Sequence, residues 1–207
     1  MHCSGNYLTA LLLVLLLTGC GSSPPLQSDR YYALSPIIRE TPAATPASGV
    51  LLVNTLAARG FLGGRQIVYR QDGQPLRVER YDWLLWEETV PRALAQSLAD
   101  AIRDAGLFEF VVTPADRARA DYILSGEVET FEHRPTDQPP RVVASLNLSL
   151  VRATDRRSVW MKTYRGEEQV DASTPEAIPD AMAESFNRLT ARLVGEVVRD
   201  LRGNRQD

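Results

Sequence analysis

Apolar residues recur at every third or fourth position in two stretches of the chain, which is the spacing of an amphipathic helix. The first stretch, residues 91–105, carries an apolar stripe formed by Val90, Leu94, Leu98, Ile102 and Ala105. Thr89 precedes it as an N-cap residue, and Gly106 follows it as a helix stop. The stripe of the second stretch consists of Ile178, Met182, Phe186, Leu189, Leu193, Val197 and Leu201. The pattern therefore predicts two helices, of which the second is long.

Strand-like patterns fill much of the remaining chain. Residues 142–150 alternate between apolar and polar side chains, as a strand with one buried face does. Further strand-like runs lie at 31–34, 50–57, 66–70, 76–81, 108–113, 121–133 and 158–170. Asp72-Gly73 separates two of these runs and predicts a hairpin, because both residues tolerate positive φ. Since the long connections exclude regular alternation of strand and helix, we expect an α+β fold: a mostly antiparallel sheet with both amphipathic helices packed on one face.

A run of mostly Leu residues, 8–17, precedes the predicted domain. It is too short for a membrane span, which needs about 20 helical residues, and has the length of the apolar part of a secretory signal. The run ends in Leu17-Thr18-Gly19-Cys20, which resembles the bacterial lipobox. That resemblance implies cleavage before Cys20 and acylation of its thiol and its new amino group. A plain cleaved signal or a short buried helix is the alternative.

The lipobox and the composition predict four segments. These are a signal peptide at 1–19, the lipidated Cys20 with a flexible tether at 20–29, one α+β periplasmic domain at 30–203 and a polar tail at 204–207. The tether assignment rests on Gly, Ser and Pro, which cannot form a core. Because one acyl chain gives only marginal binding, two or three chains on Cys20 would make attachment effectively permanent.

The residues after Cys20 bear on which membrane holds the anchor. In Gram-negative bacteria an Asp at this position tends to retain a lipoprotein at the inner membrane. Here Gly21 and Ser22 follow Cys20. The resemblance to the lipobox therefore implies the periplasmic face of the outer membrane, with the inner membrane as the alternative.

Charge and candidate chemistry exclude several function classes. The chain has 23 Lys and Arg against 26 Asp and Glu and no basic run, which argues against nucleic acid as a partner. The second cysteine, Cys3, lies in the signal, so the mature domain has neither a disulfide nor a thiol ligand set. His133 is the only histidine outside the signal, which leaves little for a triad or a metal site. We expect no enzyme activity, no cofactor and no metal.

Residues 61–86 combine aromatic side chains with interleaved arginines, the residue types enriched at interface centres. We predict a partner-binding surface formed by Arg59, Phe61, Arg65, Tyr69, Arg70 and Trp83. The alternative is that the aromatic rings complete the core of the hairpin, above all Trp83 and Trp86. The arginines suit partner carboxylates or lipid phosphates, so charge reversal at Arg65 or Arg70 should weaken binding and leave the melting temperature nearly unchanged. Tyr69 and Arg70, adjacent in one strand, should face opposite sides.

Four motifs follow one another along the chain: Tyr-Tyr-x-Leu at 31–34, Gln-Ile-Val-Tyr-Arg at 66–70, Tyr-Asp-Trp-Leu-Leu-Trp-Glu-Glu at 81–88 and Ala-Gly-Leu-Phe at 105–108. Their order and spacing, over nearly the whole mature chain, resemble the ABC-type transport auxiliary lipoproteins, which include the Pqi-type lipoprotein. Gene clusters of this family encode an ABC transporter with an MCE-domain protein, and these systems are thought to move lipids between the two membranes. The family offers no catalytic residues to carry over.

The resemblance implies a lipid-anchored accessory protein that docks the conduit of an ABC/MCE lipid transport system at the outer membrane. Its partners would be the membrane, through the acyl chains on Cys20, and the MCE-domain protein; a homo-oligomer is a further candidate assembly. One alternative is a structural or assembly lipoprotein of another envelope complex. Another is a lipid-anchored hydrolase, for which Asp82, Glu87 and Glu88 offer carboxylates.

Overall fold

The computed structural model describes residues 28–39, 41–43, 45–74 and 76–203. The predicted signal, Cys20, most of the tether and the tail at 204–207 lie outside these residues. In chain order the elements are β1 (Arg30–Tyr32), β2 (Ala47–Val53), β3 (Ala57–Ala58), η1 (Gly60–Gly63), β4 (Gln66–Tyr69), β5 (Glu79–Trp86), α2 (Val90–Asp104), β6 (Phe108–Val112), η2 (Pro114–Asp116), β7 (Tyr122–Arg134), β8 (Arg141–Arg152), β9 (Ser158–Gln169), η3 (Pro175–Ala177) and α3 (Ile178–Gly203). Both helices thus occur where the sequence predicts them. β4 and β5 pair antiparallel as predicted, but β5 begins at Glu79 and runs to Trp86, whereas the predicted strand covers residues 76–81.

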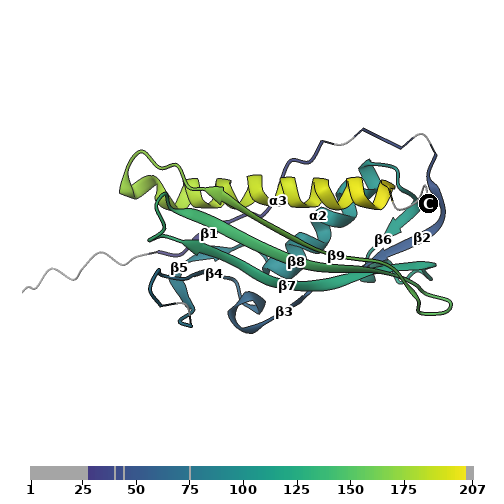
Figure 1. Ribbon diagram of the computed structural model, residues 1–207, viewed down its shortest axis with the longest axis horizontal. Coiled ribbons are helices and arrows are strands. Elements are labelled where there is room, and N and C mark those ends of the chain that lie inside the picture. Colours follow the sequence, from purple (N-terminus) through teal and green to yellow (C-terminus); the bar gives the residue numbers. More distant parts are fainter. Residues whose placement is uncertain (1–27, 40, 44, 75, 204–207) are drawn as a thin grey trace, which may run out of the picture.

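The described strands form one curled sheet centred on the long strand β7 (Figure 1). On one side β7 pairs antiparallel with β8, which pairs antiparallel with β9. On its other side β7 is shared: it pairs parallel with β2, β3 and β4 at successive positions. Two arms of the sheet extend from this side of β7. In the first arm β6 pairs parallel with β2; in the second β5 pairs antiparallel with β4, and β1 pairs parallel with β5. The sheet is therefore mixed, and the expectation of a mostly antiparallel sheet is wrong.

The two helices take different places, so the expectation that both pack on one face of the sheet is also wrong. Only α3 packs along the sheet, over β8 and β9 (Figure 1). Gly166 of β9 permits this approach, because a Cβ there would lie 2.8 Å from Cδ1 of Leu189. α2 instead lies against α3 and against the arm of β2 and β6. Its alanines Ala95 and Ala99 are buried as well as the predicted stripe, so α2 is covered on more than one side.

Aromatic rings join the hairpin to the core. Trp86 at the end of β5 is 2% exposed and packs edge-on against Phe131 and Phe186, with ring centroids 5.9 Å and 5.3 Å away. Phe131 of β7 stacks on Phe186 of α3 at 4.5 Å. The structure thus confirms the core interpretation for Trp86. Burial of such large rings contributes strongly to stability, so this cluster fixes β5 and α3 against β7.

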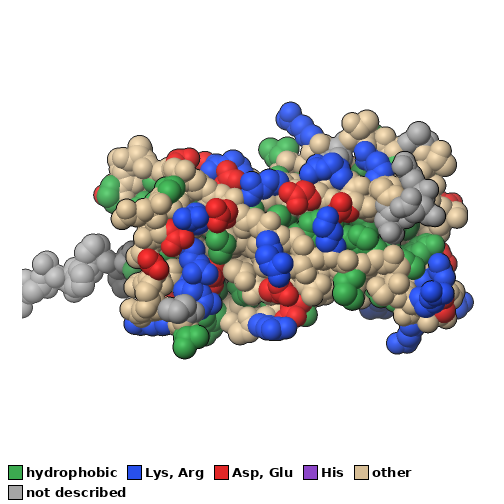
Figure 2. Space-filling view, in the orientation of Figure 1, with side chains coloured by type: hydrophobic (Ala, Val, Ile, Leu, Met, Phe, Trp, Pro, Cys, Tyr) green, Lys and Arg blue, Asp and Glu red, His purple; other side chains and the backbone are tan. Residues whose placement is uncertain are grey.

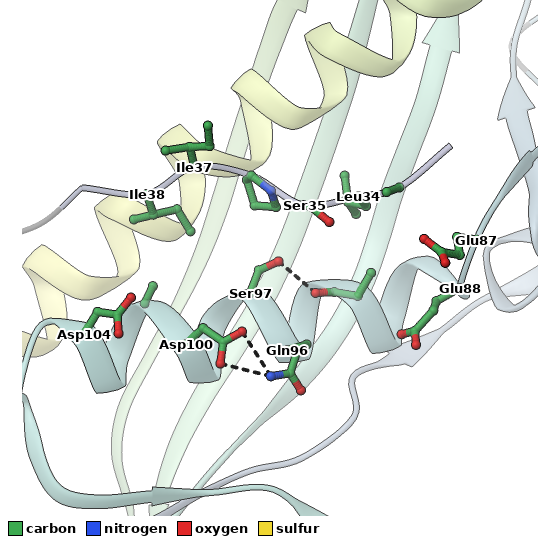
Figure 3. Close-up of a pocket in the computed structure, with 14 residues that line it drawn as sticks. Leu34, Ser35, Ile37, Ile38, Glu87, Glu88, Gln96, Ser97, Asp100 and Asp104 are labelled. Atoms are coloured by element: carbon green, nitrogen blue, oxygen red, sulfur yellow. Dashed lines mark hydrogen bonds between the residues drawn. The ribbon is translucent and has the colours of Figure 1, made fainter. Parts of the chain in front are cut away.

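A connection without helix or strand, residues 33–39 and 41–43, runs from β1 toward β2; we call it the strap. The strap crosses between α2 and α3 (Figure 3). Asn187 of α3 holds it at two points: its side chain accepts from the Ser35 amide (2.8 Å) and donates to the Ala33 carbonyl (3.1 Å). Farther along, the Ala43 amide donates to the carbonyl of Ala105 at the end of α2 (2.8 Å). The strap therefore ties both helices to the edge strand β1.

Candidate functional site

His133 is the residue on which a catalytic role would have to rest. It is 1% exposed, and its Nδ1 lies 2.8 Å from the hydroxyl oxygen of Tyr81. Burial lowers the pKa of His133 to about 4. Among the described residues its Nε2 has no hydrogen-bond partner. A catalytic triad needs a carboxylate on one ring nitrogen and a nucleophilic hydroxyl on the other, and the described surroundings of His133 supply neither arrangement.

Neither a metal-ligand cluster nor a membrane-spanning helix occurs among the described residues. Within residues 28–203, as far as they are described, no group of His, Cys, Asp and Glu could hold a metal ion. No helix in that part of the chain is long and apolar enough to cross a membrane.

Three of the six predicted binding residues, Arg59, Phe61 and Arg70, lie together on the outer face, the side of the sheet away from α3. η1 and the connection between β4 and β5 project on this side (Figure 1). The three residues line a hollow of about 330 Å³, the outer hollow, with Glu129 and Glu132 of β7. The Phe61 ring is 46% exposed and lies under the Arg80 guanidinium, 5.2 Å from the ring centroid. The outer hollow thus presents one accessible ring beside a cation.

The arginines of the outer hollow are already paired within the chain. Arg59 donates two hydrogen bonds to the carboxylate of Glu127, one from Nε and one from Nη2; the second joins Nη2 to Oε2 at 3.0 Å. Arg70 lies 3.3 Å from Glu132, a carboxylate that is only 4% exposed and that also pairs with Arg134. Arg70 is therefore held within the chain, because burial of the Glu132 carboxylate requires nearby cations. This pairing has no local signal in the sequence, because the two residues lie 62 positions apart.

Charged side chains of both signs are mixed on one face of the molecule (Figure 2). On the face that Figure 2 shows, basic and acidic side chains are interspersed and do not gather into an area of one sign. Arg165 lies 3.8 Å from Glu129, and Arg141 lies 3.1 Å from Glu167. Charges of both signs therefore lie close together on these strands.

The other three predicted residues lie elsewhere, so the six do not form one surface. Tyr69 stacks on Tyr81 with centroids 4.4 Å apart and donates to Glu79, and this hydrogen bond raises the pKa of Tyr69. Its position opposite Arg70 in the strand is confirmed. Arg65 lies beside β1: its Nε donates to the Trp86 carbonyl (3.0 Å), and its guanidinium lies 5.1 Å from the Tyr31 ring centroid.

Trp83 belongs to a separate cleft of about 600 Å³, the apolar cleft, where β7 ends and α3 begins, at the left in Figure 1. Its walls include Tyr81, Trp83, Leu84, His133, Ile178 and Met182. None of the residues that line it is Asp, Glu, Lys or Arg. This cleft cannot be predicted from local sequence patterns, because four separate segments form it. Of its lining residues, Trp83 is the one that the sequence predicts as a binding residue.

A second groove, of about 540 Å³, lies between the strap and α2 (Figure 3). The strap contributes Ile37 and Ile38, whereas α2 and the residues before it contribute the carboxylates of Glu87, Glu88, Asp100 and Asp104. Asp100 accepts two hydrogen bonds from Gln96, each 3.0 Å long. No Lys or Arg lines this groove, so its charge disfavours anionic ligands such as lipid phosphates.

The sequence and fold of this chain match a known protein family. The family model for the ABC-type transport auxiliary lipoprotein component matches residues 32–194, which include the sheet, the strap and most of α3. The chain belongs to this family. A lipoprotein of this family is a membrane-anchored protein of the periplasm, and the role of an auxiliary component fits a non-enzymatic function.

Solved structures share the fold of this chain. The chain is similar to protein XCC0632 from Xanthomonas campestris, assigned to the DUF330 family, with 26% identity and a TM-score of 0.67; the match covers 86% of this chain and 99% of that one. An uncharacterized protein shares the fold at 17% identity and a TM-score of 0.57, over 83% and 99% of the two chains. Protein CT253 from Chlamydia trachomatis has 9% identity and a TM-score of 0.50, over 76% and 98%. No curated protein matches the chain.

Proposed function

We propose that this chain is the lipid-anchored accessory component of an ABC/MCE-type intermembrane lipid transport system. Acyl chains on Cys20 would hold it at the periplasmic face of the outer membrane, where it would dock the far end of the transport conduit. The observation that carries this proposal is the family match over residues 32–194. The lipobox and the Gly21-Ser22 pair after Cys20 support the choice of membrane.

The dimensions of the chain suit such a role. Residues 21–28 span at most about 28 Å when fully extended, so the domain would stay close to its membrane. The aromatic cluster of Trp86, Phe131 and Phe186 makes the sheet a firm platform. We assign docking of the MCE-domain protein to the outer hollow. An exposed ring such as Phe61, framed by paired charges, has the composition of an interface centre with a polar rim.

The anchor can be tested by mass spectrometry of the mature N-terminus and by density-gradient fractionation of membranes. We expect an acylated Cys20 at the N-terminus and co-migration with outer-membrane markers, and we expect Cys20→Ala to abolish both. Insertion of Asp at position 21 should move the protein toward the inner membrane. An unmodified N-terminus at another residue would contradict the anchor, and fractionation with the inner membrane would contradict only the choice of membrane.

Docking can be tested by co-purification of the chain with the MCE-domain protein encoded in the same gene cluster. Phe61→Glu should reduce recovery of that protein at least tenfold, because it places a carboxylate in the outer hollow beside Glu129 and Glu132. Met161→Glu is the matched control: Met161 is 66% exposed on β9 and does not line the outer hollow. Recovery of a secretin or barrel-assembly protein in place of the MCE-domain protein would favour an assembly lipoprotein.

A further inference from the structure

The apolar cleft lies directly beside the point where the described chain begins. β1, which follows the tether, runs parallel to β5, and Arg30 is aligned with Leu84, a residue of the cleft wall. The hydroxyl of Tyr32 donates to Asp180 Oδ1 (2.8 Å) in the first turn of α3, where Ile178 also lines the cleft. Neighbouring strands lie about 4.8 Å apart. The chain that leads to Cys20 therefore leaves the domain at the edge of this cleft.

The lining of the apolar cleft suits a hydrocarbon. Leu84 and Met182 form buried parts of its wall, and the side chains of Trp83 and Ile178 remain 37% and 40% exposed. Large apolar groups exposed next to a concave apolar surface mark a binding site. The cleft volume of about 600 Å³ lies within the usual range for small-molecule sites, about 300–1,000 Å³. A charged peptide finds no ion-pair partner there, since no charged residue lines the cleft.

The apolar wall of the cleft contains one histidine, His133. His133 lines the cleft, is 1% exposed, and has no hydrogen-bond partner for Nε2 among the described residues. Burial raises the pKa of Tyr81, so its phenol keeps its proton and can donate to Nδ1. With Nδ1 as acceptor, Nε2 carries the ring proton and is a donor. Nε2 is itself buried, and burial lowers the pKa of His133 to about 4, so the neutral pair of His133 and Tyr81 presents no charge to the cleft.

We propose that the apolar cleft binds one acyl chain of a phospholipid drawn from the membrane to which Cys20 anchors the protein. The acyl chain lies among Trp83, Leu84, Ile178 and Met182. The membrane source rests on the proposed anchor, because a tether of at most about 28 Å keeps the cleft near the bilayer. Tethering also raises the local concentration of lipid at the cleft.

The experiment uses the chain from residue 20 onward with Cys20→Ala, which contains every described residue and has no lipid of its own. The protein also carries Trp86→Phe and Trp160→Phe, so that Trp83 alone reports. It is incubated with vesicles of phosphatidylethanolamine and phosphatidylglycerol whose acyl chains are dibrominated, and the vesicles are then removed. We expect about one phospholipid per chain by mass spectrometry and loss of more than half of the Trp83 fluorescence.

The blocking variant is Ile178→Asp, which places a charge at the rim of the cleft. Because Ile178 begins α3, an acidic residue there is compatible with the helix and the fold should persist. We expect at least a tenfold loss of bound phospholipid. Met161→Asp, exposed on β9 and outside the cleft, should bind lipid like the parent.

A lipid-free parent, or an Ile178→Asp variant that binds like the parent, would overturn the proposal. The lipidated protein in detergent, carrying Trp86→Phe and Trp160→Phe, tests another occupant. A change in Trp83 emission when its own acyl chains are removed, with no lipid bound to the Cys20→Ala chain, would assign the cleft to the anchor. Binding of the MCE-domain protein is measured on the same variants. If Ile178→Asp and the parent both dock while neither binds lipid, only this inference fails and the proposed function stands.

Discussion

Acidification should destabilise the protein through His133 over a defined pH range. The ordinary pKa of this side chain is 6.5, and burial lowers it to about 4 in the folded chain. Between these values the unfolded chain binds a proton that the folded chain excludes, so stability rises with pH. The neutral His133 ring makes its full contribution to the free energy of unfolding above about pH 6.5. This contribution is lost as the pH falls toward 4. Hydrogen bonds from the backbone amides of Thr113 and Arg157 lower the pKa values of Asp116 and Asp155, which therefore titrate below this range.

The two pKa values set the size of the effect. Linkage gives a loss of about 2 kcal/mol between pH 7.5 and pH 5, and of about 3 kcal/mol once the folded state is also protonated. With a urea m-value of about 2 kcal/mol/M, typical of small proteins, the unfolding midpoint should fall by about 1 M between pH 7.5 and pH 5. A thermal scan should show a drop of about 4–8 °C.

Urea unfolding followed by circular dichroism at several pH values between 5 and 7.5 measures this slope. His133→Phe keeps a ring in the cleft wall and removes the titrating group, so its midpoint should depend on pH far less than that of the parent. The variant also loses the bond to Tyr81, and its absolute stability is therefore not the test. Equal pH slopes in the parent and in His133→Phe would refute the argument.

Three further substitutions test the packing and the ion pairs. Leu193→Ala should cost about 2–5 kcal/mol in urea unfolding because Leu193 is 1% exposed; an unchanged midpoint would mean that the helix face is wrong. Gly126→Ala should cost about 3 kcal/mol or more by the same assay, since its Cβ would lie 2.1 Å from the Asn147 carbonyl oxygen; a stable variant would contradict the pairing of β7 with β8. Arg70→Glu should cost about 3 kcal/mol and lower the melting temperature, because it turns a cation on buried Glu132 into an anion; an unchanged melting temperature would restore the expectation from the sequence.

The parts of the fold that the sequence predicts are those with a local signal. Both helices, the hairpin at Asp72-Gly73 and the alternation in β8 depend on spacing within one segment. The pairing of β2 and β4 with the same edge of β7 depends on contacts between distant segments, which periodicity does not contain. The buried second side of α2 was missed for a related reason, because alanines such as Ala95 and Ala99 carry little hydrophobic signal of their own.

The candidate site divides in the same way. The exposed ring of Phe61 and the opposite placement of Tyr69 and Arg70 follow from local sequence. The ion pairs do not, since Glu127 lies 68 positions from Arg59. The apolar cleft has no local signature at all, because strand ends, a loop and the start of α3 contribute one or a few residues each. A pattern of arginines in the sequence thus indicates an exposed surface. Which of these arginines form ion pairs within the chain can be learned only from the fold.

The central claim is that this family member docks an MCE-domain conduit, and direct binding tests it. The chain from residue 20 onward with Cys20→Ala would be immobilised, and the affinity of the purified MCE-domain protein from the same gene cluster measured by surface plasmon resonance. We expect saturable binding that Met161→Glu leaves unchanged and that Phe61→Glu weakens at least tenfold. Absence of saturable binding to the parent chain would contradict the account.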